Sequence, residues 1–284
     1  MDKTNRTIYI IAAVFLIIVL VAIYFLFIFQ KKPKEPKSEE SEFEVKSVQD
    51  IELAKRPYIT LTPTTDGAEI VLSIENMDNF DNIEYELTYL ADNPQIAGEK
   101  IQRGSTGTDV NPKEPKYKKS ILLGTASKGV RSPDKGVTDG KLTMHMFKGG
   151  TEFTSETTWV LTQAGSKASE IKDQSQKLKF NLPALDKDHW IIITDTLGVP
   201  PDNKEFKVND VILPVYGVFS VAPQFPKSAS LSINLDKDVK SPQLYTFSHT
   251  ESKWQKLEVT IDESSKTISV QTNSFATFVI VSSK

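Results

Sequence analysis

The sequence predicts an all-β fold, in which two antiparallel β-sandwich domains follow a single N-terminal transmembrane helix. Three observations support this prediction. One uninterrupted apolar segment lies near the N-terminus, short alternating or β-branched segments recur after it, and Gly, Pro and Asp residues separate those segments. After the apolar segment, no part of the sequence keeps a helical hydrophobic period over three turns.

Residues 8–29 form the predicted transmembrane helix, because every one of them is apolar or aromatic. About 22 helical residues at about 1.5 Å each span roughly 33 Å, close to the thickness of about 30 Å of a hydrocarbon core. A cleaved signal peptide is the alternative, but its apolar part is shorter and ends in small residues. Here the bulky residues 25–29 continue up to Gln30. We therefore expect an uncleaved single-pass anchor that contacts the lipid bilayer.

Residues 1–7 are expected to lie in the cytosol, which places the C-terminal domains on the other side of the cell membrane. A short N-terminal end before a signal-like anchor usually stays in the cytosol, and long domains cross a membrane with limited regard to flanking charge. The lysines within residues 31–37 argue for the opposite orientation, because basic flanks favour the cytosolic side. We favour an extracytoplasmic location for the globular part, and the opposite orientation remains the alternative.

Residues 30–55 are predicted to form a charged, flexible stalk. Pro33 and Pro36 lie among lysines, and serine and acidic residues follow from Ser38 to Glu42. So few apolar side chains cannot bury enough surface to offset the entropy cost of ordering the chain.

Charge and cysteine content exclude several classes of protein. The chain has 284 residues, with 34 Lys and Arg against 37 Asp and Glu. Residues 1–37 hold six of the basic and two of the acidic residues, which leaves 28 against 35, a net charge of −7, for the rest. An acidic globular part argues against nucleic acid as a partner, because phosphate contacts need clustered Lys and Arg. Without cysteine, the chain has no disulfide, thiol nucleophile or cysteine metal site.

Residues 56–164 are predicted to form the first sandwich. Alternation is clearest in residues 83–90, where every second residue is apolar. The other expected strands are 58–62, 68–75, 120–127 and 141–147. The segment 57–90 resembles the opening strands of fibronectin-type-III and immunoglobulin-like domains. The Gly- and Pro-containing segment 91–119 is expected to be a long loop and a candidate contact surface.

Residues 165–284 are predicted to form the second sandwich. Its hydrophobic segments are, in order, 177–185, 190–194, 214–223, 225–233, 244–247, 254–257 and 274–281. In this order they resemble the β-sandwich of ankyrins, netrin receptors and tight-junction scaffold proteins, the ZU-five domain, and similar modules occur in bacterial surface proteins. The resemblance implies protein–protein contact or structural support. Some relatives cleave themselves at a His-Phe-Ser sequence, but here that region reads Asn273-Ser274-Phe275, so we expect no cleavage.

No residue is predicted to be catalytic, to bind a cofactor or to hold a metal ion. The histidines are His145, His189 and His249; they lack metal-binding spacing and are expected at surface or edge positions. The sequence contains no G-x-S-x-G elbow, Walker loop or G-x-G-x-x-G fingerprint. A Ser-His-Asp triad stays open, since its members meet only in space.

Two other groups of residues have a functional and a structural interpretation. Asp186–Asp188 and Asp236–Asp238 offer carboxylates for Ca²⁺, but each lacks the oxygens and the Gly that a calcium loop needs, so we interpret them as turns. Trp159, Trp190 and Trp254 could form a carbohydrate platform, although packing over neighbouring strands is favoured. Trp254 lies on the more polar face of its expected strand, which predicts partial exposure.

The sequence therefore predicts a non-enzymatic, membrane-anchored binding or structural module of the cell envelope, whose partner is a protein or a surface glycan. Two alternatives remain open. One is an envelope enzyme that acts on glycans or peptides, and the other is an accessory subunit of a secretion or pilus assembly.

Overall fold

The structure, a computed structural model, describes residues 44–201 and 203–282. This part of the chain consists of strands and three short 3-10 helices, which confirms the all-β prediction. The predicted transmembrane helix at residues 8–29 and the cytosolic segment 1–7 lie outside the described residues. Within the described ranges, no helix has the length and apolar character needed to cross a membrane.

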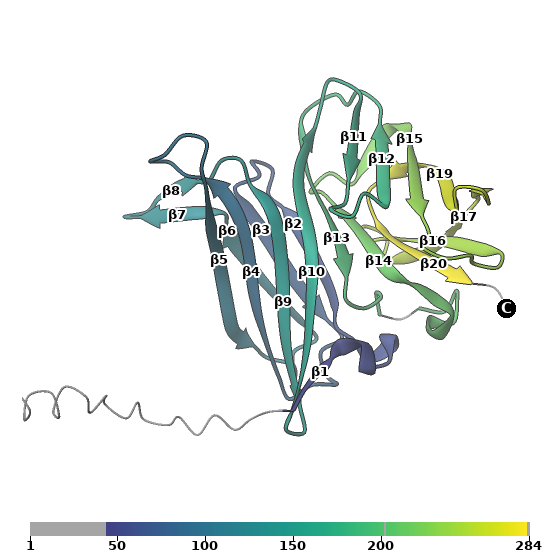
Figure 1. Ribbon diagram of the computed structural model, residues 1–284, viewed down its shortest axis with the longest axis horizontal. Helices are drawn as coiled ribbons and strands as arrows, with labels where there is room; N and C mark the ends of the chain where they lie inside the picture. The colour runs from purple at the N-terminus through teal and green to yellow at the C-terminus, as the bar shows by residue number, and fades with distance from the viewer. Residues whose placement is uncertain (1–43, 202, 283–284) are drawn as a thin grey trace, which may run out of the picture. The chain divides into compact units, whose positions relative to one another are not determined.

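The largest sheet, sheet A, crosses the whole described unit. Its ten strands are β1 (Glu44–Ser47), β4 (Asn82–Asp92), β5 (Lys100–Val110), β9 (Thr138–Lys148), β10 (Thr151–Ala164), β13 (His189–Thr196), β14 (Val211–Phe219), β16 (Pro242–Ser248), β17 (Lys253–Leu257) and β20 (Thr277–Ser282). They lie in the order β17-β16-β20-β14-β13-β10-β9-β4-β5, with β1 paired to β10 (Figure 1). Neighbouring strands are antiparallel except β1 and β10, which run parallel.

Three smaller sheets accompany sheet A. Sheet B contains β2 (Tyr58–Pro63), β3 (Glu69–Glu75) and β6 (Lys116–Leu122), and sheet C is the hairpin of β7 (Gly124–Ser127) and β8 (Val130–Pro133). Sheet D contains β11 (Ser169–Lys172), β12 (Leu178–Leu182), β15 (Gln224–Asn234), β18 (Thr260–Asp262) and β19 (Thr267–Ser274). The 3-10 helices are η1 (Val48–Asp50), η2 (Leu53–Lys55) and η3 (Val208–Asp210).

Sheets B and D cover opposite faces of sheet A. Ile192 of β13 belongs to the core that sheet A shares with sheet B, whereas its neighbours Ile191 and Ile193 belong to the core shared with sheet D. Successive side chains of a strand point to opposite faces. The continuous apolar residues 190–193, unlike the alternating strands, therefore mark a strand that is buried on both sides.

Close packing explains why residue 140, beside the first core, is a glycine. Trp159 of β10 is almost fully buried, and a Cβ atom added at Gly140 of β9 would lie 2.2 Å from its ring. The two residues pair directly across the β9–β10 ladder. Only glycine leaves room for the indole at this position.

The predicted boundary between residues 164 and 165 lies at the end of β10. Sheet A continues across it, because six residue pairs join β10 to β13, from Trp159–Thr194 to Ala164–His189. All described residues belong to one compact unit. This unit therefore contains two hydrophobic cores that share sheet A.

The structure differs from the sequence predictions at three places. Residues 44–55, assigned to the end of the stalk, form β1, η1 and η2, and Val48 is buried in the first core. The prediction of a long loop at residues 91–119 is wrong, because β5 and the start of β6 lie there. Trp254 was expected to be partly exposed but is only 6% exposed, because it packs against Phe206 and Phe247.

Candidate ligand-binding cleft

Sheet A is forked beside β10. Along the edge of β10 that faces away from β9, residues 151–154 pair with β1 and residues 159–164 pair with β13. Residues 155–158 lie between these two ladders, and the continuation of β13 at Asp195 and Thr196 pairs with β14 instead. The strands therefore separate at this point, and a cleft opens between them.

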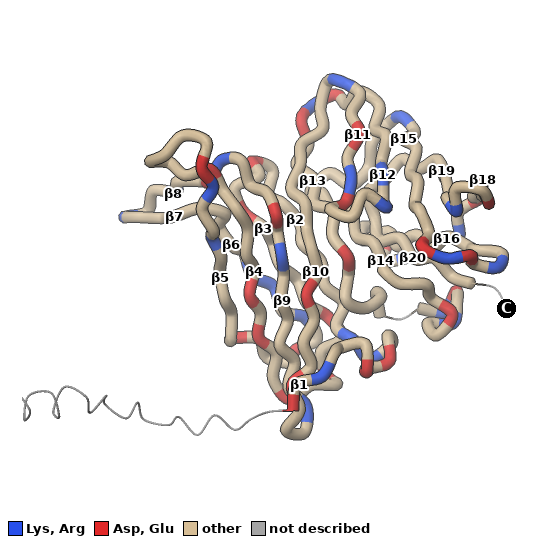
Figure 2. The backbone as a smooth tube through the Cα atoms, viewed as in Figure 1, with Lys and Arg blue, Asp and Glu red and all other residues tan. Residues whose placement is uncertain are grey.

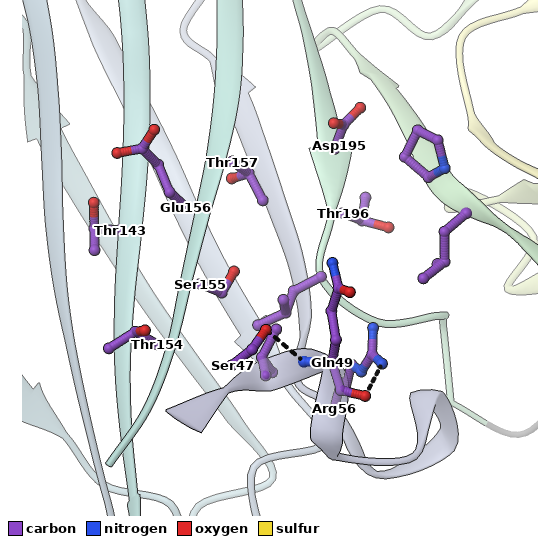
Figure 3. Close-up of a pocket in the computed structure, with 14 residues that line it drawn as sticks. Ser47, Gln49, Arg56, Thr143, Thr154, Ser155, Glu156, Thr157, Asp195 and Thr196 are labelled. Atoms are coloured by element: carbon purple, nitrogen blue, oxygen red, sulfur yellow. Dashed lines mark hydrogen bonds between the residues drawn. The ribbon is translucent and has the colours of Figure 1, made fainter. Parts of the chain in front are cut away.

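This fork cleft has a volume of about 350 Å³ and is lined by both polar and apolar residues, the apolar ones being Val48, Leu197, Leu213 and Pro214. Its hydroxyl groups belong to Ser47, Thr143, Thr154, Ser155, Thr157 and Thr196. Ser155 and Thr157 lie on the side of β10 nearer to β13, while Gln49 and Arg56 lie below them and Asp195 across from them (Figure 3). Most of these groups stand on paired strands, so the cleft is largely preformed.

Arg56 is held rigidly at the floor of the fork cleft. Its side chain is 7% exposed, and Nε and Nη2 donate to the carbonyls of Ile51 (2.8 Å) and Gln49 (3.2 Å). Its own carbonyl accepts a hydrogen bond of 2.8 Å from Asn76. Burial lowers the pKa of the guanidinium from its ordinary value, but an arginine remains charged at neutral pH. A fixed positive charge therefore lies at the base of the cleft.

Asp195 supplies a carboxyl group with a raised pKa on the β13 side of the cleft. Burial, and then the charge of Asp173, raise its pKa from 3.8 to about 6, while Lys177 acts in the opposite direction. The third titratable neighbour is Tyr216, which pairs with Asp195 across the β13–β14 ladder. A buried acid whose ionisation costs energy is a common feature of functional sites.

Glu156, the second acid of the cleft, has a different environment. It is exposed and forms an ion pair of 3.0 Å with Lys141 of β9. In the close-up view, Glu156 lies on the side of β10 away from Asp195 (Figure 3). The two acids are therefore not arranged as a pair that shares a proton.

A second pocket, of about 280 Å³, lies near the ends of β2 and β16. The Tyr58 hydroxyl lies 2.5 Å from Thr277 Oγ1 and 3.1 Å from His249 Nε2, and His249 Nε2 lies 3.2 Å from Thr277 Oγ1. Burial lowers the pKa of His249 to about 4, so its imidazole is neutral at pH 7. The charged residues of this pocket, Glu75 and Lys116, pair with each other at 2.6 Å. The side chains of Tyr58, His249, Glu75 and Lys116 thus have partners at the pocket, which indicates a structural contact. The buried Nε1 of Trp254 has no hydrogen-bond partner among the described residues.

Replacing Tyr58 with Phe is expected to destabilise the chain by about 1–2 kcal/mol, because Thr277, which is fully buried, and His249 both lose the hydroxyl that they share. Urea denaturation of the full-length chain measures this loss. Tyr117→Phe is the matched control, since its hydroxyl donates to Asp109 at the exposed surface. Equal effects of the two substitutions would contradict a structural role for the Tyr58 hydroxyl.

The remaining histidines are held apart in other environments. His145 Nδ1 lies 2.6 Å from Glu152 on the neighbouring strand. His189 is 8% exposed and lies 3.7 Å from Asp186, so the expectation of a surface or edge position fails for its side chain. Within residues 44–201 and 203–282, no three His, Cys, Asp or Glu side chains are grouped as a metal site would require.

The Asp-rich segments and the tryptophans also lie apart. Asp236 pairs with Lys177 and Asp238 with Lys266. Trp159 is in the first core, whereas Trp254 is in a separate apolar cluster with Tyr245. The three indoles therefore do not line one exposed platform.

No protein-family model matches the chain, and no curated protein matches it. None of the fork-cleft residues was predicted from the sequence to bind a ligand. One signal was present for Asp195, which is an acid directly after the apolar segment 190–194. Arg56 gave no signal, because its burial depends on the fold of residues 44–55 against β10.

Proposed function

We propose that this chain is a membrane-anchored binding module of the cell envelope and that its ligand occupies the fork cleft. Residues 8–29 would hold it in the bilayer, and the described unit would face the outside of the cell. The observation that carries the proposal is the fork cleft itself. It combines a preformed cavity, several hydroxyl groups and a fixed arginine, which are the features of a site for a polar ligand.

The charge distribution supports a partner other than nucleic acid. Lys and Arg are interspersed with Asp and Glu along the strands and turns of the described part (Figure 2). The chain beyond residue 37 is net acidic. A nucleic-acid-binding protein instead gathers its basic residues on one face.

The two cores can also be assigned to families of β-sandwich domains. We propose that the first core with sheet B is related to immunoglobulin-like or fibronectin-type-III domains, and the second core with sheet D to ZU-five domains. Support comes from the face-to-face packing of antiparallel sheets around each core. Both kinds of domain commonly mediate contacts between proteins, which agrees with a binding role.

One observation favours an enzyme of the envelope as a second candidate. Asp195, with its raised pKa, and Glu156 line the same cleft, and glycoside hydrolysis uses one protonated and one ionised carboxyl group. The pairing of Glu156 with Lys141 and its place on the far side of β10 favour binding over this chemistry. Turnover of an envelope glycan that is lost in both Asp195→Asn and Glu156→Gln would reverse this preference.

Protease treatment of intact cells tests the location on which the proposal depends. We expect a protease added outside the cell to degrade the globular part or release it. A cytosolic protein serves as the control for cell integrity. Protection of the globular part until the cells are opened would overturn the envelope proposal.

A further inference from the structure

We infer that the fork cleft binds a carboxylate group of its ligand and that Arg56 is the residue that recognises it. This inference rests on the proposed function, because it names the ligand chemistry of the same cleft. It begins from a buried charge that no carboxylate of the described residues balances.

Arg56 is a buried cation without a counter-ion among the described residues. Its side chain is 7% exposed, yet among the described residues no carboxylate lies within ion-pair distance of it. Lys116, the cation of the second pocket, pairs directly with Glu75. Buried charges in proteins are normally paired, because removing an ion from water is costly. The exception at Arg56 lies in an open cleft, where a bound anion can complete the pair.

The hydrogen bonds of Arg56 leave part of its guanidinium available. Nε and Nη2 each donate to a backbone carbonyl of the segment that contains η1. The described contacts include no hydrogen bond from Nη1, which carries two further N–H groups. The bonds to Ile51 and Gln49 fix the plane of the guanidinium, so binding would cost little side-chain entropy. An arginine that is already oriented is well suited to a planar anion.

The surroundings of Arg56 favour a carboxylate over a phosphate. Serine and threonine hydroxyls of β10, among them Ser155 and Thr157, can donate further hydrogen bonds in the same cleft. Asp195 and Glu156 also line it, and these acids oppose a dianion more strongly than a monoanion. A carboxylate matches the flat guanidinium and carries only one charge.

Titration of the full-length chain in mild detergent with acetate, acetamide and inorganic phosphate tests the inference. Acetamide is the matched control, since it has the shape of acetate without the charge. NMR shifts of the Arg56 side-chain N–H groups report binding at the site, at constant ionic strength. We expect saturable shifts with acetate, and affinity at least about tenfold weaker for acetamide. Tighter binding of phosphate than of acetate would overturn the choice of a carboxylate.

Three variants separate the role of Arg56 in ligand binding from its role in folding. Arg56→Gln is expected to weaken acetate binding by about tenfold or more, and Arg56→Lys, which keeps the charge but not the planar group, by about threefold to tenfold. Shifts of the cleft backbone amides replace the arginine signal in these variants. If Arg56→Gln does not fold, Asp195→Asn decides, because it leaves the bonds of Arg56 intact and removes a negative charge from the cleft. We expect this variant to bind acetate about threefold to tenfold more tightly at pH 7.5.

The outcomes distinguish this inference from the proposed function. Equal binding of acetate and acetamide, or unchanged acetate binding in Arg56→Gln, would overturn the carboxylate inference. In either case a neutral ligand of the cleft would still agree with an envelope binding module. Protection from protease in intact cells would remove the proposed function but would leave a measured acetate site unaffected.

Discussion

Phe180→Ala is expected to destabilise the chain by about 3–5 kcal/mol, the largest effect of any substitution considered. Phe180 of β12 is fully buried at the centre of the core between sheets A and D. Its ring lies 5.6 Å from Phe275, 6.2 Å from Phe278 and 6.3 Å from Phe225, measured between ring centroids. Truncation removes one member of all three contacts and leaves a cavity that strands on two sheets cannot close.

Chemical denaturation of the full-length chain measures this loss. Asn181→Ala is the control, because Asn181 is the exposed neighbour on the same strand, and its effect should stay within about 0.5 kcal/mol. A loss below about 1 kcal/mol for Phe180→Ala would contradict the packing described for this core.

The same substitution shows whether the two cores unfold together. In a Trp190→Phe, Trp254→Phe background, Trp159 remains as the only tryptophan and reports on the first core. Because the β10–β13 ladder joins the two halves of sheet A, we expect Phe180→Ala to shift the Trp159 transition as well. A transition of Trp159 that does not move would mean that the first core is an independent folding unit.

Strands with a strong hydrophobic pattern were predictable from the sequence. The expected segment 83–90 corresponds to β4, and the apolar segment 190–194 lies within β13. β5 escaped prediction because its glycines resemble loop residues. Gly107 in fact makes room for a ring, since a Cβ atom there would lie 2.3 Å from Tyr85. An edge strand of this kind is specified by its neighbour rather than by its own propensity.

The fork cleft was not predictable, because it depends on where two ladders end. Residues 155–158 of β10 have no partner strand on one edge, because β13 diverges there and β1 pairs only with residues 151–154. Neither feature leaves a local pattern in the amino-acid sequence. The burial of Arg56 depends on the same arrangement. Sequence periodicity reports which face of a strand is apolar, but it carries no information on which edge is open.

Asp195→Asn is expected to stabilise the chain by about 1–3 kcal/mol at pH 7.5, an unusual direction for a substitution in a folded unit. Burial, together with the charge of Asp173, raises the pKa of Asp195 from 3.8 to about 6. An acid with a higher pKa in the folded state gives up its proton more readily when the chain unfolds. Its contribution to stability is therefore lost as the pH rises from about 4 through 6. Asparagine keeps the shape of the side chain and has no charge to bury.

Urea denaturation of both proteins between pH 5 and 8 measures this effect, and the advantage of the variant should grow with pH over that range. Glu156→Gln is the matched control, because this exposed acid of the same cleft pairs with Lys141, and its effect should stay below about 1 kcal/mol. An advantage of Asp195→Asn that does not change with pH would contradict the raised pKa. Asp195 is partly buried, and its ionisation weakens the fold at neutral pH. If the same variant also binds acetate more tightly, Asp195 limits both the stability of the chain and the affinity of the cleft for anions.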